Sequence, residues 1–499
     1  MLKQAKLLHV PTMHKDAPRK SIRFADLTFG DAQAGLWDAM LPGEAILPIL
    51  GRASKVGLES IEVLTPAVFL ACVNRLHEDP WERVRLAAER ATHTKIAVLT
   101  RGRFGFGSRP LATPVLEAMV ERLAGSGARR HVVYDPVNDI TQLARTLHVS
   151  RAQGLETSVA LVYSIAPYST PSQFASWALQ AVELGADSVC LYDPAAVLTP
   201  DAAVAVLAAL RDGLDCPIEL RTNASTGLAE VVCLRAVSEG LVDVVHTACL
   251  PAAGDGSYPP LDYFVEHLTR MGHSLEVAAE DASALSDYVA AIMERRGLPR
   301  GQHGLHDRLR LRHQMPPSVL ERYRTLLNDR LQAEWLTTVA ELAEQLGRPP
   351  MSEPIASVVG EQAFSAVRGF DTDGATMSTD FRRLVLGGFG KLPGEVCKDL
   401  LDRASAERTA HEIAADRSPV STVLGTPDDL LRLLCPVPIV DAFFSDRSKA
   451  SLRLQTATDA QTPIIQLMDE LTRYSDVRKL NIRKGDWSLE FSAADSKKG

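Results

Sequence analysis

The sequence predicts an α/β protein: a (β/α)8 TIM barrel followed by a helical domain and a small C-terminal helix-hairpin. Three observations carry this prediction. Between residues 21 and 298, short apolar segments alternate with stretches whose apolar residues recur every three or four positions. Such alternation is typical of βα units in a parallel sheet, and about eight units in this length match a closed barrel. Beyond residue 299 the helical spacing continues alone, and near the end of the chain it changes to alternation in twos.

The candidate strands all lie in the first 298 residues. They are Ile22–Thr28, Ser60–Leu64, Ile96–Thr100, His131–Tyr134, Ser158–Tyr163, Ser188–Tyr192, Ile218–Asn223 and Val242–Thr247. The intervening segments, such as Pro171–Leu184 and Pro200–Arg211, carry apolar residues at helical spacing. An open, doubly wound sheet is the alternative architecture. The dinucleotide-binding pattern G-x-G-x-x-G does not follow the first strand, which favours the barrel.

The chain divides into five expected segments. An N-terminal arm over 1–20 precedes the barrel over 21–298, and a helical domain over 299–425 follows it. Prolines mark a connector over 426–455. The last segment, 456–499, combines a hairpin around Lys484-Gly485-Asp486 with a helical apolar stripe, which comprises Ile464, Leu467, Met468, Leu471 and Tyr474. One helix and one hairpin are too small to form a core alone, so we expect this segment to pack on another surface.

Composition and charge exclude several classes of protein. A net charge of −8 argues against a nucleic-acid partner, because phosphate binding requires clustered cations. No apolar run is long enough for a signal sequence or a membrane span, so we expect a cytoplasmic protein without a membrane partner. The 7 cysteines form no C-x-x-C pair, which favours buried thiols over disulfides or a metal site.

A block near the start of the chain carries the most specific pattern. Residues Asp26 to Gly35 read D-L-T-F-G-D-A-Q-A-G and are similar to D-x-T-L-R-D-A-H-Q-S, which marks the carboxyltransferase subunits of pyruvate carboxylase, oxaloacetate decarboxylase and transcarboxylase. Further blocks match in order over about residues 21–400, namely Glu78–Arg83, Arg101-Gly102, Tyr134–Asp139, Thr226–Glu230 and Val358–Ala363. The chain therefore resembles this family over most of its length, and the resemblance implies the same barrel.

The resemblance also implies a divalent metal held by an aspartate, a carbamylated lysine and two histidines. Asp31 stands at the aspartate position, whereas Tyr192, Arg221 and Asn223 stand at the lysine and histidine positions. Neutral tyrosine and asparagine are poor ligands, and a permanently charged arginine repels a cation. We therefore expect no metal of the family type.

The altered positions fall at strand ends or in the loops that follow, where they should line the mouth of a barrel. Arg101 is the main surviving pocket cation, and Arg221 is a candidate for stabilising an oxyanion in place of the metal. His246 and Tyr192 are candidates for moving a proton. The alternative is a decayed site whose polar groups satisfy one another. Substrate binding is expected from Asp31, Gln33, Asn223 and Asp193.

Two functions remain open from the sequence. The first is a metal-free carboxyltransferase or decarboxylase for a small carboxylate or keto acid. It would work within a multi-subunit assembly, with no covalently bound cofactor of its own and with carboxybiotin supplied by a partner carrier protein. The alternative is a catalytically silent pseudoenzyme subunit that organises active partners. A lyase of the related aldolase-type barrels is less favoured, because those enzymes also depend on the lost metal.

The expected partners follow from the end of the chain. Residues 456–499 resemble the leading segment of biotin carboxyl carrier protein, but the chain contains no A-M-K-M biotin-attachment sequence. We therefore expect this segment to dock a biotin carboxyl carrier protein or a biotin carboxylase subunit. The alternative is that it folds back onto its own barrel. A homo-oligomer is also expected.

Overall fold

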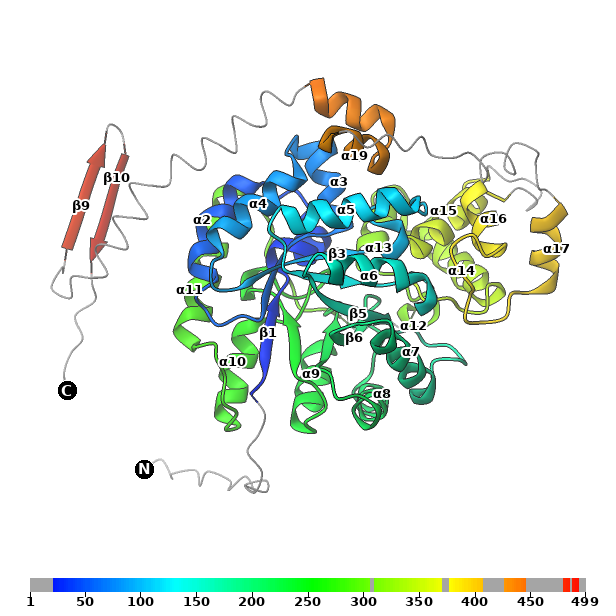
Figure 1. Cartoon of the computed structure of the whole chain (residues 1–499), viewed down its shortest axis with the longest axis horizontal. Helices are drawn as coiled ribbons and strands as arrows, with labels where there is room; N and C mark the ends of the chain where they lie inside the picture. The colour runs from blue at the N-terminus through cyan, green and yellow to red at the C-terminus, as the bar shows by residue number, and fades with distance from the viewer. Residues whose placement is uncertain are drawn as a thin grey trace.

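The computed structural model describes residues 21–305, 309–369, 377–406 and 426–445, together with the backbone of 479–484 and 487–492. At its centre is a closed barrel of parallel strands in the order β1 to β8, in which β8 pairs back onto β1 (Figure 1). The predicted barrel is confirmed, and the alternative of an open sheet is wrong. The strands are β1 Arg23–Asp26, β2 Ser60–Leu64, β3 Lys95–Thr100, β4 Arg130–Val133, β5 Glu156–Val162, β6 Ser188–Asp193, β7 Ile218–Thr222 and β8 Val244–Thr247.

A ring of helices covers the outside of the barrel (Figure 1). The helices of this part of the chain are α1 Gln33–Trp37, α2 Gly43–Ala53, α3 Pro66–Ala71, α4 Pro80–Arg90, α5 Thr113–Gly125, α6 Ala144–Ala152, α7 Pro171–Glu183, α8 Pro200–Gly213, α9 Ala229–Ser238, α10 Leu261–Arg270 and α11 Ala279–Arg296. Several begin with proline behind a capping side chain, as in Thr170 before α7 and Thr199 before α8. Proline suits this position because its missing N–H would have no helical partner, so these residues set where the helix starts.

The barrel strands are buried on both sides, which places polar residues inside the barrel at two depths. Every residue of β6 is buried. Cys190 and Tyr192 belong to the apolar cluster inside the barrel, whereas Val189 and Leu191 pack outward against the helices. In the register of β6 with β7, Cys190 pairs with Glu219, and Tyr192 pairs with Arg221. The second pair therefore lies nearer the carboxyl ends of the strands, which form the mouth of the barrel.

A helical domain follows the barrel and has its own apolar core (Figure 1). Trp335 is fully buried in this core and donates a hydrogen bond from its Nε1 to the carbonyl of Gly360 at 2.8 Å. Phe104, in the loop after β3, stacks on Phe389 with 5.6 Å between the ring centroids and so joins the two units. The helices of this domain are α12 Arg310–His313, α13 Pro317–Arg324, α14 Asp329–Gln345, α15 Ile355–Val367, α16 Thr379–Val385 and α17 Lys398–Ala406. No helix in the described part of the chain is both long enough and apolar enough to cross a membrane.

Part of the expected connector over 426–455 is helical. Helix α19, Pro427–Leu434, begins with a capping box in which Thr426 and Asp429 bond each other's backbone. Leu431 and, further on, Phe443 are fully buried, so this stretch packs against the barrel and is not a loose linker. Strands β9 Lys479–Lys484 and β10 Trp487–Ser492 form the predicted antiparallel hairpin. The helix predicted over 464–474 lies outside the described residues.

Asp26, the last residue of β1, is a buried carboxyl group with an unusual pKa. Its Oδ1 accepts a hydrogen bond from the Thr28 hydroxyl at 2.6 Å, and its Oδ2 accepts one from the Thr28 backbone N–H at 3.2 Å. Burial nevertheless raises the pKa of Asp26 to about 7, because these hydrogen bonds do not compensate the lost hydration. A folded pKa above the unfolded value means that this group supports folding at low pH and opposes it as pH rises through about 7.

Replacing Asp26 with asparagine should therefore change how stability depends on pH. The difference in free energy of unfolding between Asp26→Asn and the wild type should move in favour of the variant between about pH 5 and pH 8, by roughly 2–3 kcal/mol. Urea denaturation at several pH values measures this difference. Asp287→Asn, which removes an exposed carboxylate from α11, controls for the change in net charge. A difference that stays constant over this range would contradict the prediction.

Candidate active site

A cavity of about 720 Å³ lies between the mouth of the barrel and helix α13 of the helical domain. Its volume is in the range typical of small-molecule sites. The helical domain contributes Pro316, Ser318, Glu321, Arg322 and Glu353, and the barrel side contributes Asp31, Leu99, Arg101, Tyr134, Tyr192, Asn223 and Tyr258. Four of the residues that we expected at the site therefore lie around one cavity: Asp31, Arg101, Tyr192 and Asn223.

Arg221 lies directly behind this cavity, between two carboxylates. Its Nη1 donates to Glu62 Oε2 and its Nη2 to Asp31 Oδ2, both at 2.8 Å, while its Nε donates to the Tyr258 hydroxyl at 3.2 Å. The Arg221 side chain is 0% exposed, whereas that of Asp31 is 24% exposed. Desolvation disfavours the charged guanidinium, but Glu62, Tyr258 and Asp31 outweigh it and raise the pKa of Arg221. All three nitrogens are thus engaged, and the guanidinium does not face the cavity as we had expected.

Gly30 makes room for this arrangement. A Cβ atom at Gly30 would lie 2.4 Å from Glu62 Oε1 and 2.6 Å from its Cγ. Glu62 Oε1 also accepts the backbone N–H of Asp31 at 2.9 Å, so the carboxylate is tied both to the loop and to Arg221. Burial raises the pKa of Glu62, and the adjacent guanidinium opposes that effect. The absence of a side chain at position 30 and the carboxylate at position 62 therefore depend on each other.

Arg101 is differently placed. Its Nε donates to the Tyr134 hydroxyl at 3.2 Å and its Nη1 to the carbonyl of Gly107 at 3.1 Å. Tyr134 in turn donates to the carbonyl of Glu353 at 2.9 Å, so the helical domain helps to hold this group. Arg101 forms no ion pair with any described residue, and it lines the cavity. Its charge is available to a ligand, as the sequence predicted.

Tyr192 and Asn223 complete the wall at the ends of β6 and β7. Tyr192 packs edge-on against Tyr134, with 5.8 Å between the ring centroids, and the Arg221 guanidinium lies 5.3 Å from its own ring. Burial raises the pKa of Tyr192 well above its ordinary value, so the phenol is neutral and can donate a hydrogen bond. The Asn223 side-chain carbonyl accepts from the N–H and hydroxyl of Ser225, which leaves its amide group for the cavity.

Two other expected substrate-binding residues hold loops and do not line the cavity. Asp193 accepts the backbone N–H groups of Val197 and Leu198 at 3.0 and 2.9 Å and is fully buried. Burial raises the pKa of Asp193 to about 6. Gln33 donates to the carbonyl of Phe29 and accepts the N–H of Leu41, again without exposure. Both side chains shape the loops that carry the cavity wall.

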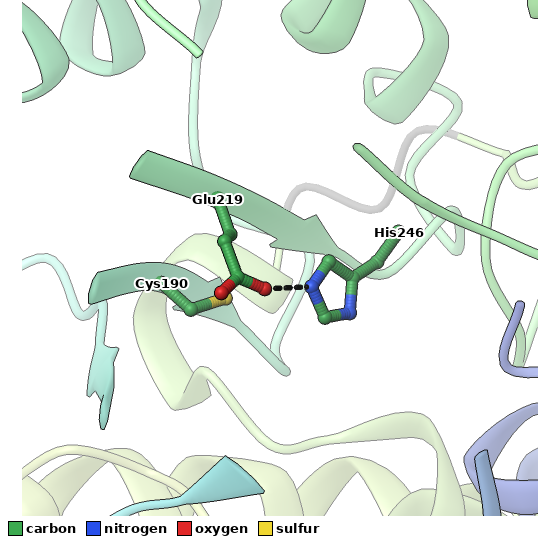
Figure 2. Close-up of side chains that lie close together, drawn as sticks. All are labelled: Cys190, Glu219 and His246. Carbon is green, nitrogen blue, oxygen red and sulfur yellow. Dashed lines mark hydrogen bonds and ion pairs between the residues drawn. The ribbon is translucent and has the colours of Figure 1, made fainter. Parts of the chain in front are cut away.

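His246 lies deeper in the barrel than we had expected. Its Nε2 is 2.7 Å from Glu219 Oε2, and both residues are buried below the layer that contains Arg221 (Figure 2). Burial lowers the pKa of His246, so it is neutral at physiological pH. It is not among the residues that line the cavity. Position 246 precedes the end of β8, and its side chain joins the lower layer because inward-facing residues alternate along a strand.

Cys190, Glu219 and His246 bring their ligand atoms within 4.8 Å of one another, as Figure 2 shows. This spacing is compatible with a metal ion, but the surroundings of Glu219 are not. Its carboxylate is already paired with the Arg130 guanidinium and accepts the hydroxyl of Ser158 at 2.8 Å. Arg130 outweighs desolvation and holds the pKa of Glu219 well below its ordinary value. We therefore interpret this cluster as a satisfied polar layer of the barrel core.

The sequence did not lead us to Glu62 or Tyr258, although both contact Asp31 or Arg221. Glu62 carried a signal, because it is a charged residue inside the apolar strand Ser60–Leu64, where an ionised group needs a partner. Tyr258 carried none that can be read without the fold, since it follows β8 in an irregular loop.

Comparison with known proteins agrees with this fold and location. No protein-family model matches the chain. It is 28% identical over 394 residues to a pyruvate carboxylase subunit of Methanocaldococcus jannaschii, covering 77% of this chain and 69% of the relative. It is 25% identical over 466 residues to the methylmalonyl-CoA carboxyltransferase 5S subunit of Propionibacterium freudenreichii subsp. shermanii, covering 89% and 91%.

Solved structures give the same answer for the fold. The carboxyl transferase domain of Rhizobium etli pyruvate carboxylase, solved with oxamate and biotin, superposes with a TM-score of 0.74 at 22% identity, over 89% of this chain and 79% of that one. Likeness at this identity establishes the shared barrel and helical domain. Taken with the sequence relatives, it shows that this chain is a homologue of the carboxyltransferase subunits of biotin-dependent carboxylases.

Proposed function

We propose that this chain is the carboxyltransferase-type subunit of a multi-subunit, biotin-dependent assembly. In this proposal it transfers or removes a carboxyl group on a small carboxylate without a metal ion in the barrel. The observation that carries the proposal is the Arg221 guanidinium held between Asp31 and Glu62 at 2.8 Å from each. A fixed positive charge thus stands beside the one family metal ligand that the chain retains.

The donors around Asp31 do not suit a divalent metal. Asp31 Oδ2 already accepts hydrogen bonds from Arg221 and Tyr258. The remaining positions that the resemblance assigns to ligands are Tyr192, whose pKa lies well above its ordinary value, and Asn223, whose carbonyl is bonded to Ser225. A cation at this place would have to displace a buried guanidinium from two carboxylates. These contacts support a metal-free site.

The residues that face the cavity can divide the work of carboxyl transfer. Arg101 binds the carboxylate of the substrate, because its charge has no carboxylate partner among the described residues. Asp31, assisted by the Tyr258 hydroxyl, is placed to accept or return a proton. The neutral Tyr192 phenol can donate to oxygen that becomes negative. Arg221 is a positioning residue, since it fixes Asp31 and Tyr258 without touching the cavity. Carboxybiotin on a partner carrier would supply the carboxyl group.

The second candidate function is a silent subunit that organises active partners. One observation favours it: the positive charge of Arg221 is fully used inside the protein and cannot reach a substrate. In either case we infer that the partners are a biotin carboxyl carrier protein and a biotin carboxylase subunit. The relatives are themselves subunits, among them a pyruvate carboxylase subunit and the large subunit of 2-oxoglutarate carboxylase.

Turnover should depend on Arg101 and should not depend on metal. Purified chain should catalyse decarboxylation or isotope exchange of small carboxylates with free biotin, and kcat/KM should fall roughly 100-fold or more in Arg101→Gln. Chelators should leave the rate unchanged. Arg75→Gln, which removes an arginine of the same cavity that is paired with Asp38, should keep most of the activity.

Three outcomes would decide between the two functions. Stoichiometric metal by elemental analysis, lost in Asp31→Ala, would contradict the metal-free proposal. Equal rates in wild type and Arg101→Gln would contradict the site assignment. Absence of turnover, together with a requirement for this chain in the activity of the partner subunits, would establish the silent alternative.

A further inference from the structure

The cavity offers a single docking point for an anion. Three arginines line it, and two of them are paired: Arg75 with Asp38, and Arg322 with Glu353 at 3.5 Å. Arg101 has no carboxylate partner among the described residues, and its Nη2 makes no hydrogen bond with them. A ligand can therefore place one carboxylate on Arg101, but no second free cation of the described residues awaits another.

The other charged group of the cavity is an acceptor. Both side-chain hydrogen bonds of Asp31, from Arg221 and from Tyr258, go to its Oδ2. Its Oδ1 has no hydrogen-bond partner in the described part of the chain, and the side chain is 24% exposed on the cavity wall. Behind it stand two carboxylates, Asp31 and Glu62, against one guanidinium. This end of the cavity therefore favours a ligand group that donates hydrogen bonds and carries positive charge.

Arg101 and Asp31 are close enough to be bridged by a small molecule. The Tyr134 hydroxyl is bonded to Arg101, and its pKa also responds to the charge of Asp31. The pKa values of Arg101 and Tyr192 respond to each other's proximity, and Tyr192 is also affected by Asp31. Both charged groups thus border the same pair of phenol rings, Tyr134 and Tyr192, which pack against each other.

We propose that the cavity binds a small zwitterion, a monocarboxylate that carries a protonated amine, with the carboxylate on Arg101 and the amine on Asp31. This inference rests on the proposed function for its site and names the substrate class of that site. A dicarboxylate has only one cation to bind, and its second carboxylate would face Asp31. A simple keto acid presents a carbonyl, which is an acceptor, to the acceptor Oδ1. An amine instead forms a charge-assisted hydrogen bond there.

Binding of matched small molecules to the full chain tests the proposal. The panel is glycine, β-alanine and γ-aminobutyrate as zwitterions of increasing length, propionate and ethylamine as one-ended controls, and pyruvate and oxaloacetate as keto acids. Calorimetry should show one of the zwitterions binding roughly 10-fold or more tighter than propionate, ethylamine or either keto acid. Tighter binding of a keto acid than of every zwitterion would overturn the proposal, as would no binding at all.

Variants assign the two ends. Asp31→Asn should remove the advantage of the zwitterion over propionate, while Arg101→Gln should weaken both ligands. Asp38→Asn, which lies on the same cavity but is paired with Arg75, should bind all ligands as the wild type does. Unchanged zwitterion affinity in Asp31→Asn would refute the placement. Thermal unfolding of each variant establishes that it is folded. Turnover of a keto acid without zwitterion binding would refute this inference alone, whereas zwitterion binding without carboxyl transfer would refute the proposed reaction alone.

Discussion

Replacing Arg221 with alanine is expected to lower the free energy of unfolding by about 3–5 kcal/mol. The substitution removes the only cation that contacts both Asp31 and Glu62 among the described residues, and Glu62 is 2% exposed. A buried carboxylate without its partner retains the full cost of lost hydration, and this cost exceeds the net value of the pair itself. Denaturation in urea at neutral pH measures the loss.

A double substitution separates loss of the partner from loss of packing. In Arg221→Met with Glu62→Gln, no strongly buried charge remains unpaired, so most of the lost stability should return. Arg235→Ala, which breaks the exposed pair with Glu239, should cost less than about 1 kcal/mol. If Arg221→Ala were no more destabilising than Arg235→Ala, the guanidinium would not be the counter-charge that the geometry indicates.

The fold was largely readable because its signals are local. The strand β2 was predicted with its observed bounds, Ser60–Leu64, and α7 ends one residue before the predicted Leu184. Apolar runs and Pro-led helix starts depend on neighbours in the sequence, so they survive without knowledge of the tertiary structure. The expected connector failed for a related reason. Its prolines suggested a linker, but Leu430, Leu431 and Leu434 form an apolar helical face that the barrel buries.

The site was only partly readable, because it depends on depth and on pairing across the barrel. Arg101 and Asp31 line the cavity as expected, since each follows a strand end directly. Arg221 and His246 were assigned to the same cavity, yet one is sealed behind Asp31 and the other lies in the layer of Glu219. Position along a strand gives the face of a residue but not its layer, which is set by the stagger of the whole barrel. The pairing of Arg221 with Glu62 spans 159 positions and leaves no local pattern.

Replacing Gly30 with alanine is expected to destabilise the protein by about 3 kcal/mol or more, although the change adds a single methyl group. The new Cβ would stand 2.4 Å from Glu62 Oε1 and 2.9 Å from its Cδ. Because those atoms belong to the carboxylate that grips Arg221, relieving the clash means breaking that ion pair. Chemical denaturation of the purified variant measures the effect. Gly51→Ala in α2 is the matched control, since its nearest neighbour would be 3.7 Å away and alanine favours a helix.

Shortening Glu62 in the same chain tests whether the clash is the cause. In the Gly30→Ala background, Glu62→Ala should cost far less than it does in the wild type, because the carboxylate has already been displaced. The two substitutions should therefore be coupled by roughly 1–3 kcal/mol, and strictly additive effects would contradict the dependence. The resemblance places an arginine at position 30 and a histidine at 221, whereas this chain has Gly30 and Arg221. Coupling of this size would mean that the loop can give up its arginine only if Glu62 fills the space, and that Glu62 can be buried only if Arg221 pairs with it.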